Sequence, residues 1–232
     1  MKLVILFLLT LLSINCTAQT VEQIIEKHIT AIGGSEACKK LNNYKIEGKS
    51  TVMLQEVGVV MYKKYQKTRQ EISMMGMNMV TGYNGTSAWM INPLSGNDSA
   101  VVLDDSESAG LAQNNIFDNN LLSYINNGYL VQLLPKETID KTNCFVIQLT
   151  KTNKATEVYY INTATFLITQ INVTVNINGK TTLTKLNYAD YKKEGDLLMP
   201  HTIFMLMGEM KITKVTFETQ LNDALFEVPT AK

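Results

Sequence analysis

Residues 170–177 read QINVTVNI, and their polar and apolar side chains alternate without a break. A period of two is the pattern of a β-strand that has one face on the core and the other in water. Asn178-Gly179 follows at once, and this pair favours the tight turn of a β-hairpin. The stretch therefore predicts a long antiparallel strand that turns directly into the next one.

The same alternation extends outward in both directions. It covers residues 44–54, 57–67, 69–75, 79–83, 87–91 and 99–103, and it resumes at Leu130 and continues toward the end of the chain. Asn84-Gly85 is another hairpin signal. The apolar phase switches between Ile212 and Val215, which indicates a β-bulge in the last strand. This spacing predicts about eleven strands.

Two segments have helical spacing instead. Thr20 and Gln23 form a capping box at the start of the first segment, and Gly33-Gly34 ends it. The apolar residues of the second segment are Ile116, Phe117, Leu121, Tyr124 and Ile125, and Gly128 ends it. We therefore expect an N-terminal helix and one amphipathic helix inserted between strands.

The expected fold is mainly β, of the α+β type. Two short helices cannot cover both faces of so large a sheet, so we expect the curved antiparallel sheet to curl around them. This predicts a half-open barrel in which the N-terminal helix and the inserted helix plug the concave side above an apolar space. No repeat, linker or low-complexity block divides residues 19–232, which predicts a single domain.

Residues 1–18 have the pattern of a signal peptide. Lys2 supplies the positive start, residues 3–14 form a nearly unbroken apolar run, and small residues precede Gln19. This predicts an exported protein of the periplasm or the outer membrane, peripheral to the membrane at most. Cys16 offers an alternative, because bacterial lipoprotein signals end just before a cysteine that becomes lipidated.

Charge and cysteine usage exclude some classes of function. The chain has 21 basic and 21 acidic residues, and no basic patch stands out, which argues against nucleic acid as a partner. Cys38 and Cys144 remain after residue 18. They could pair in an oxidising compartment, but two isolated cysteines are more often buried small hydrophobes, and we favour free thiols.

Sequence motifs for catalysis are missing. The chain has no Gly-x-Ser-x-Gly, no His-Glu-x-x-His and no phosphate-binding glycine loop. His28 and His201 are the only histidines, and His28 lies on the apolar face of the first predicted helix, where a core role is expected. We therefore expect no enzyme, no catalytic residue and no cofactor.

Methionines concentrate in two short runs, residues 74–79 and 205–210. Methionine side chains adapt to irregular apolar guests, and the thioether is also a soft ligand for Cu(I). The runs therefore fit three interpretations: ordinary core, the wall of a ligand cavity, or a metal site built from Met199, His201 and Met205. For the cavity, the predicted lining residues are Trp89, Met75, Met77, Phe117, Leu121, Tyr124, Met205 and Met207.

Several segments resemble the LolA-type outer-membrane lipoprotein-sorting proteins, in their divergent Bacteroidetes form. They are residues 31–36 (AIGGSE), 82–93 (GYNGTSAWMINP), 159–163 (YYINT), 188–191 (YADY) with Gly195 and Pro200, and 221–229 (LNDALFEVP). The resemblance implies an incomplete barrel with helices as a lid, which binds acyl chains or another hydrophobic guest. Carriers of this fold use a cavity arginine to control ligand release, and Arg69 is the only arginine in this chain.

The sequence is thus interpreted as an exported binding or carrier protein of the cell envelope. Its expected ligand is a hydrophobic small molecule or the acyl chains of a lipoprotein. Two alternatives stay open: a periplasmic methionine-rich Cu(I)-binding protein, and an envelope-assembly module that binds envelope proteins and no ligand. Bound lipid, bound copper and a protein partner, respectively, would distinguish the three.

Overall fold

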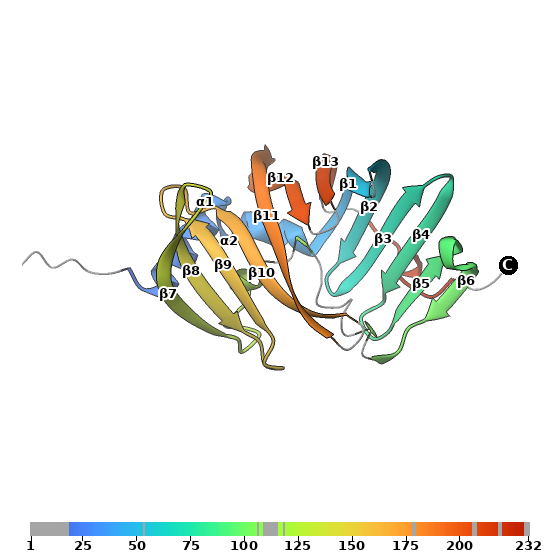
Figure 1. The fold of residues 1–232 in the computed structure, drawn as a ribbon, viewed down its shortest axis with the longest axis horizontal. Coiled ribbons are helices and arrows are strands. Elements are labelled where there is room, and N and C mark those ends of the chain that lie inside the picture. Colours follow the sequence, from blue (N-terminus) through green and yellow to red (C-terminus); the bar gives the residue numbers. More distant parts are fainter. Residues whose placement is uncertain are drawn as a thin grey trace, which may run out of the picture.

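The computed structural model describes residues 19–52, 54–105, 107–108, 116–117, 119–177, 180–205, 208–217 and 220–229. Its strands form one antiparallel sheet in the order β6-β5-β4-β3-β2-β1-β13-β12-β11-β10-β9-β8-β7. The sheet is strongly curved but not closed, which confirms the mainly β, half-open architecture (Figure 1). The strands are β1 (Asn43–Val52), β2 (Gln55–Lys64), β3 (Lys67–Met74), β4 (Met77–Tyr83), β5 (Ala88–Asn92), β6 (Asn97–Val102), β7 (Leu130–Ile139), β8 (Thr142–Thr150), β9 (Thr156–Asn162), β10 (Ile168–Ile177), β11 (Lys180–Glu194), β12 (Leu197–Met205) and β13 (Gly208–Phe217).

The sheet has thirteen strands, somewhat more than the approximate count from the sequence. The hairpin that joins β7 to β8 through Asp140 and Lys141 was not predicted from the sequence. Both residues take left-handed backbone conformations, with φ of 45° and 68°. Such turns usually carry Asn or Gly, so this one has no recognisable signal.

The pairing of β1 with β13 joins the first and last strands of the chain. Its register shifts where Glu47 faces Lys214 and Gly48 faces Ile212, so Thr213 is the extra residue of a β-bulge. This confirms the bulge predicted between Ile212 and Val215. A side chain on Gly48 would come within 2.6 Å of the Lys211 carbonyl oxygen, so the two strands can approach this closely only with glycine there.

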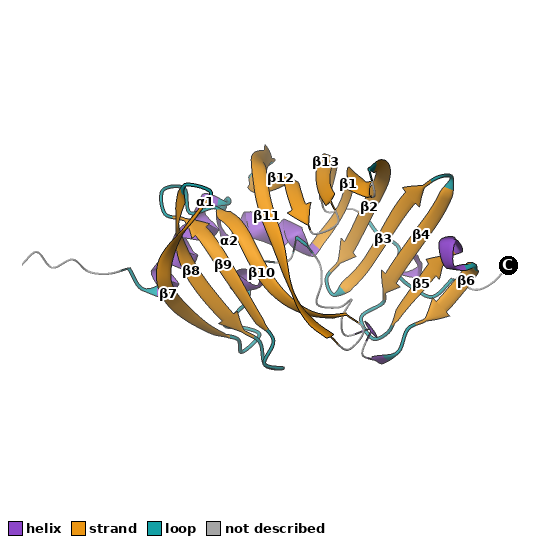
Figure 2. Cartoon of the chain, in the orientation of Figure 1, coloured by secondary structure: helices purple, strands orange, loops and turns teal. Residues whose placement is uncertain are grey.

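The N-terminal helix α1 (Val21–Ala31) has the predicted capping box. The Thr20 hydroxyl accepts a hydrogen bond from the Gln23 amide at 3.3 Å, and the Gln23 side chain accepts one from the Thr20 amide at 3.1 Å. Ile24 and Ile25 on its buried face pack against side chains of β8, β9 and β10. Figure 2 shows α1 and α2, in purple, near strands β7 to β12, with further short purple helices at the other end of the sheet near β5 and β6.

A sharp corner joins α1 to the short helix α2 (Gly34–Cys38) and the 3₁₀ helix η1 (Lys39–Asn42). Gly33 has a φ of 120°, and a side chain there would come within 2.2 Å of the Asp196 carbonyl oxygen. The corner is fixed to the sheet by a hydrogen bond from the Leu198 amide to the Ile32 carbonyl at 2.9 Å. This contact holds the helices over the start of β12.

The α-helix predicted over residues 116–125 is not formed by the described residues of that stretch. Asn120–Leu122 forms only a short 3₁₀ helix, η3, which is followed by turns through Gly128. The Asn119 side chain accepts from the Leu121 amide, and asparagines that bond the local backbone in this way compete with helical hydrogen bonds. Two apolar side chains of the predicted helix, Phe117 and Leu121, are nevertheless buried, as expected. We call residues 116–117 and 119–128 the inserted segment.

The C-terminal residues 220–229 cross the strands of the N-terminal half. The Lys64 ammonium on β2 donates to the Leu221 carbonyl at 3.0 Å. The Arg69 guanidinium on β3 donates to the Leu225 carbonyl at 3.0 Å. The Trp89 indole on β5 donates to the carbonyl of Phe226 at 2.8 Å. We call residues 220–229 the C-terminal strap, because each bond ties it to a different strand.

Two buried cysteines lie in different parts of the core. Cys38 belongs to the cluster under α2 and β12, and Cys144 belongs to a smaller cluster on β8 and β9. Both are free thiols. Burial raises the pKa of Cys38 to about 11, so this thiol stays protonated and acts as a small apolar side chain.

Candidate binding cavity

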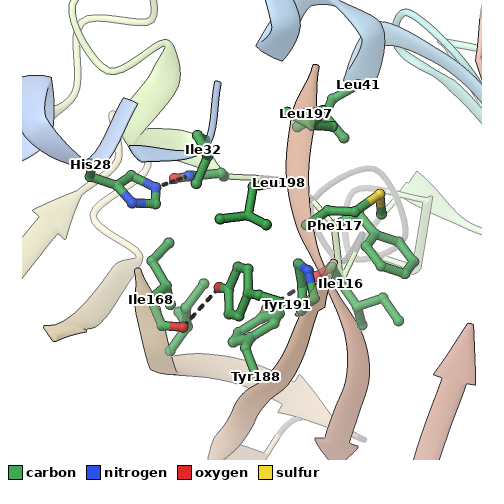
Figure 3. Close-up of a pocket in the computed structure, with 14 residues that line it drawn as sticks. His28, Ile32, Leu41, Ile116, Phe117, Ile168, Tyr188, Tyr191, Leu197 and Leu198 are labelled. Atoms are coloured by element: carbon green, nitrogen blue, oxygen red, sulfur yellow. Dashed lines mark hydrogen bonds between the residues drawn. The ribbon is translucent and has the colours of Figure 1, made fainter. Parts of the chain in front are cut away.

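An apolar cavity of about 60 Å³ lies between α1, the inserted segment and strands β10 to β12. Figure 3 shows Leu198 between Ile32 on one side and Tyr191 on the other. The lining residues are His28, Ile32, Leu41, Ile116, Phe117, Asn119, Ile168, Ile171, Tyr188, Tyr191, Leu197, Leu198, Met199 and Pro200. Most of these side chains are hydrocarbon, so the cavity favours an apolar guest.

The tyrosines of this lining already have hydrogen-bond partners. The Tyr191 hydroxyl donates to the Ile168 carbonyl at 2.8 Å, and the Tyr188 hydroxyl donates to the Ile116 carbonyl at 3.0 Å (Figure 3). Burial raises the pKa of Tyr191, so its hydroxyl remains a donor. These two residues therefore turn ring carbons toward the cavity and leave no unpaired hydroxyl for an apolar guest to cover.

His28 connects α1 to the inserted segment. Its Nδ1 lies 2.7 Å from the Phe166 carbonyl oxygen, and its Nε2 lies 2.7 Å from the Asn119 amide nitrogen. Because a carbonyl can only accept and an amide nitrogen can only donate, Nδ1 carries the proton and Nε2 accepts. Burial lowers the pKa of His28 to about 4, although the Phe166 carbonyl works in the opposite direction. The ring is therefore neutral at neutral pH, as this pairing requires.

Asn120 anchors the same segment to the sheet. Its side-chain amide donates to both carboxylate oxygens of Glu157 on β9, at 2.9 and 3.0 Å. Glu157 also pairs with Lys151 at 2.7 Å, and only 9% and 8% of the Lys151 and Glu157 side chains is exposed. The Tyr159 hydroxyl donates to Glu157 at 2.5 Å, because burial and the carboxylate raise the pKa of this tyrosine well above its usual value. The inserted segment is thus held by Asn119 at the helix and by Asn120 at the sheet.

A larger polar groove of about 660 Å³ adjoins the apolar cavity. The two spaces share Leu41, Phe117 and Asn119 as lining residues. The groove runs between the α1–η1 corner, the β2–β3 turn and the inserted segment. Its lining residues are Ile29, Ser35, Cys38, Lys39, Leu41, Asn42, Lys63, Tyr65, Gln66, Phe117, Asn119, Asn120, Leu122, Ser123, Asn126 and Asn127.

The predicted cavity residues of the inserted segment divide between two core clusters. Phe117 lines both the cavity and the groove. Leu121 is buried in the cluster that contains the α1 side chains, and Tyr124 packs against the same cluster. Of these three residues, only Phe117 lines the cavity.

Trp89 lies elsewhere, at the other end of the sheet. It is fully buried, and its ring occupies the space where a side chain on Gly82 would stand. The Arg69 guanidinium lies 5.3 Å from the centre of its ring. Arg69 and Trp89 both donate to the C-terminal strap, and neither is among the described residues that line the cavity or the groove. The arginine therefore fastens the strap.

The first methionine run forms a hairpin tip. Met75 occupies the β3–β4 turn, where 73% of it is exposed and its φ is 53°. Met77 pairs with Met74 across this hairpin and is half-buried. In the second run, Met205 packs against the hydrophobic cluster that contains Cys38 and Met199, whereas Met207 lies outside the described residues.

Met75 yields a stability prediction, because a left-handed conformation is strained for methionine but tolerated by asparagine. Met75→Asn is expected to raise the free energy of unfolding by about 0.5–1 kcal/mol, measured by chemical denaturation. Uptake of a fluorescent fatty acid should stay unchanged. Weaker uptake at unchanged stability would instead place Met75 at the ligand.

The three residues of the metal alternative, Met199, His201 and Met205, all lie on β12. Met199 lines the apolar cavity, and Met205 packs in the same hydrophobic cluster as Met199. His201 is buried on β12, with its Nε2 3.0 Å from a carboxylate oxygen of Glu194. In the part of the chain that the structure describes, no group of three His, Cys, Asp or Glu side chains is placed to hold a metal ion.

Most of the cavity lining could not be chosen from the sequence. His28 was recognisable as a polar residue on an apolar helix face. Tyr188, Tyr191 and Ile168 carry no such signal, because the cavity forms only where three strands meet the helix. The Glu157–Lys151 pair has no sequence signal either, because the two residues flank an ordinary turn.

Solved structures with similar folds include a LolA superfamily protein and a DUF1329 family protein. The LolA superfamily protein NE2245 from Nitrosomonas europaea matches with a TM-score of 0.57 and 14% identity, over 90% of this chain and 98% of that one. A DUF1329 family protein from Desulfovibrio piger matches with a TM-score of 0.59 and 13% identity, over 90% and 98% of the two chains. No protein-family model and no curated protein matches the sequence. The chain has a LolA-like fold, as its sequence resemblance predicted.

Among the described residues, no helix is both long enough and apolar enough to cross a bilayer.

Proposed function

We propose that this protein binds a hydrophobic ligand in the cavity beneath the inserted segment and acts as a binding or carrier protein of the cell envelope. The observation that carries this proposal is the hydrocarbon lining of the cavity, where Tyr188 and Tyr191 are already hydrogen-bonded to the backbone. The LolA-like fold adds support, because the family resemblance implies a guest such as an acyl chain. Binding of this kind needs no chemistry on the ligand.

An acyl chain needs more room than the present cavity offers. Sites for small molecules have volumes of roughly 300–1,000 Å³, whereas this cavity measures about 60 Å³. The inserted segment therefore has to move outward when the ligand enters. Such a movement would break the hydrogen bonds that join Asn119 to His28 and Asn120 to Glu157. Burial of each methylene group of the ligand would stabilise the complex by about 0.8 kcal/mol.

Export is part of the same proposal. Residues 1–18 would direct the chain out of the cytoplasm and be removed, and residues 19–232 would act as one domain in the periplasm or at the outer membrane. Lipidation at Cys16 would be the alternative means of attachment, and Cys16 lies outside the described residues.

A blocked cavity tests the proposal. Leu198→Trp adds an indole to the lining of the cavity and is expected to reduce uptake of a fluorescent fatty acid by the purified protein at least tenfold. The matched control is Leu133→Trp, which adds the same ring at an exposed leucine of β7. Thermal midpoints of both variants show whether each is folded.

Two results would contradict the proposal. One is a wild-type protein that takes up no fatty acid and yields no lipid in mass spectrometry of organic extracts. The other is a folded Leu198→Trp variant that takes up the fatty acid as well as Leu133→Trp does. In either case the cavity would be part of an ordinary core.

A further inference from the structure

Three hairpin turns in the N-terminal half of the sheet carry large apolar side chains that are exposed. Leu54, in the β1–β2 turn, is 98% exposed, and Met75, in the β3–β4 turn, is 73% exposed. Leu94, in the β5–β6 turn, is 48% exposed. Turns are ordinarily formed by small or polar residues, yet these three turns contain no charged residue. A single exposed apolar residue is common on a protein surface, so the position of these three relative to one another decides what they indicate.

The three turns lie on the same rim of the sheet. Because β1 to β6 are paired in chain order and each pair is antiparallel, successive turns alternate between the two rims. The turns after β1, β3 and β5 therefore share one rim, at the upper ends of these strands in Figure 1. The turns after β2 and β4 share the other rim, where Lys64 and Asn84 bond to the C-terminal strap. We call the three exposed apolar residues together the apolar rim.

Two residues of the apolar rim have a backbone conformation that is unfavourable for their type. The φ angle is 64° at Leu54 and 53° at Met75. Glycine and asparagine are the residues that tolerate this left-handed region. Because both side chains are exposed, burial in the core does not compensate for the strain. Strained residues that the fold itself does not need indicate a role in binding something else.

The apolar rim complements the uncharged acyl layer of a membrane. No ion has to be desolvated when the three tips enter that layer, because the turns themselves contain none. Glu56, two residues after Leu54, is already paired with Lys49 at 2.7 Å. The tips also project separately from three hairpins, and none of them is among the described residues that line the cavity or the groove. A fluid bilayer can accept separate side chains wherever they stand, whereas a protein partner would need a pocket for each.

We propose that the apolar rim docks on a lipid bilayer, with Leu54, Met75 and Leu94 inserted at its surface. The contact is peripheral, because only the tips of hairpins enter the membrane. It requires no ligand in the cavity and is therefore independent of the proposed function. It would hold the protein at a surface that contains acyl chains.

Flotation with vesicles of phosphatidylcholine tests the proposal. Residues 19–232 are used, so that neither the predicted signal peptide nor Cys16 contributes to binding. The wild-type chain is expected to float with the vesicles, and added salt should not release it, because the contact is apolar. The double variant Leu54→Asn/Met75→Asn should bind about tenfold more weakly or worse, since two apolar side chains no longer enter the bilayer. Asparagine tolerates the left-handed conformation, so this loss would not come from unfolding, which thermal midpoints check.

Tyr65→Asn is the matched control. Tyr65 is 69% exposed and has a φ of 54°, but it lies in the β2–β3 turn on the opposite rim. This variant should float as the wild-type chain does. Met75→Trp should also keep the binding, and the fluorescence of its added indole should shift to shorter wavelengths when vesicles are present, because the tip enters an apolar layer.

Several results would overturn the proposal. They are a wild-type chain that does not float, a double variant that floats equally well, and a Tyr65→Asn variant that loses as much binding as the double variant. Self-association of the wild-type chain that the double variant loses, without flotation, would assign the apolar rim to a second copy of the chain. Uptake of a fluorescent fatty acid is measured separately, so the proposed function and the membrane contact can fail independently.

Discussion

Lys151→Met is expected to lower the free energy of unfolding by about 3–5 kcal/mol. The substitution removes the cation that lies 2.7 Å from Glu157 and leaves a buried carboxylate without its counter-charge. Asn120 and Tyr159 still donate to that carboxylate, but two neutral donors do not replace an ammonium group. Chemical denaturation followed by circular dichroism measures the loss.

The double variant Lys151→Met/Glu157→Gln is the control for this prediction. The glutamine side chain is uncharged, and its carbonyl oxygen can still accept from Asn120 and Tyr159. We expect the double variant to recover at least half of the loss, because replacing both partners of a buried ion pair costs far less than removing one. A double variant as unstable as the single one would show that Lys151 contributes by packing and not by charge.

Acid is expected to destabilise the protein through His28. In the folded state the pKa of His28 is about 4, against an ordinary value of 6.5. Between these values the unfolded chain binds a proton that the folded protein does not, so stability falls as the pH falls. The full contribution is present above pH 6.5 and decreases by about 3 kcal/mol by pH 4. Protonation would also remove the acceptor that Asn119 uses.

Denaturation curves at a series of pH values between 6.5 and 4 measure this dependence. His28→Gln keeps a side-chain amide near Asn119 but does not titrate, so its stability should change less over the same range. Identical pH profiles for the wild type and His28→Gln would contradict the assignment of a neutral, buried imidazole.

Much of the sheet could be predicted because its determinants are local. The alternating residues 170–177 lie in β10, and the predicted capping box at Thr20 begins α1. The bulge at Thr213 lies where the apolar phase switches after Ile212. Each of these patterns depends on neighbours within a few residues of the chain. The resemblance to LolA-type proteins drew on the same local segments, and the fold agrees with it.

The inserted segment shows where local reasoning failed. The spacing of Phe117, Leu121 and Tyr124 fits a helix, but the structure uses Asn119 and Asn120 to reach His28 and Glu157 instead. Both of those partners lie far away in sequence, so no local pattern could reveal them. Asparagine is a weak helix former, and two tertiary bonds outweigh the helical spacing here.

The cavity residues were harder to predict for the same reason. Phe117 faces the cavity, whereas Trp89 lies under the C-terminal strap and Met75 forms an exposed turn. Aromatic and methionine side chains are apolar wherever they occur, and composition does not tell which of several clusters they join. His28 lines the cavity, although only a core role was expected for it.

The C-terminal strap and the β1–β13 pairing have a consequence for the order in which the chain folds. β1 has β13 as one of its two neighbours, and the strands β2, β3 and β5 are bonded to residues beyond β13. The strands that are synthesised first therefore cannot complete their contacts until the last strands have been synthesised. Folds dominated by such distant pairings form slowly and expose unpaired strands meanwhile. During synthesis the N-terminal strands would remain a substrate for chaperones until the strap arrives.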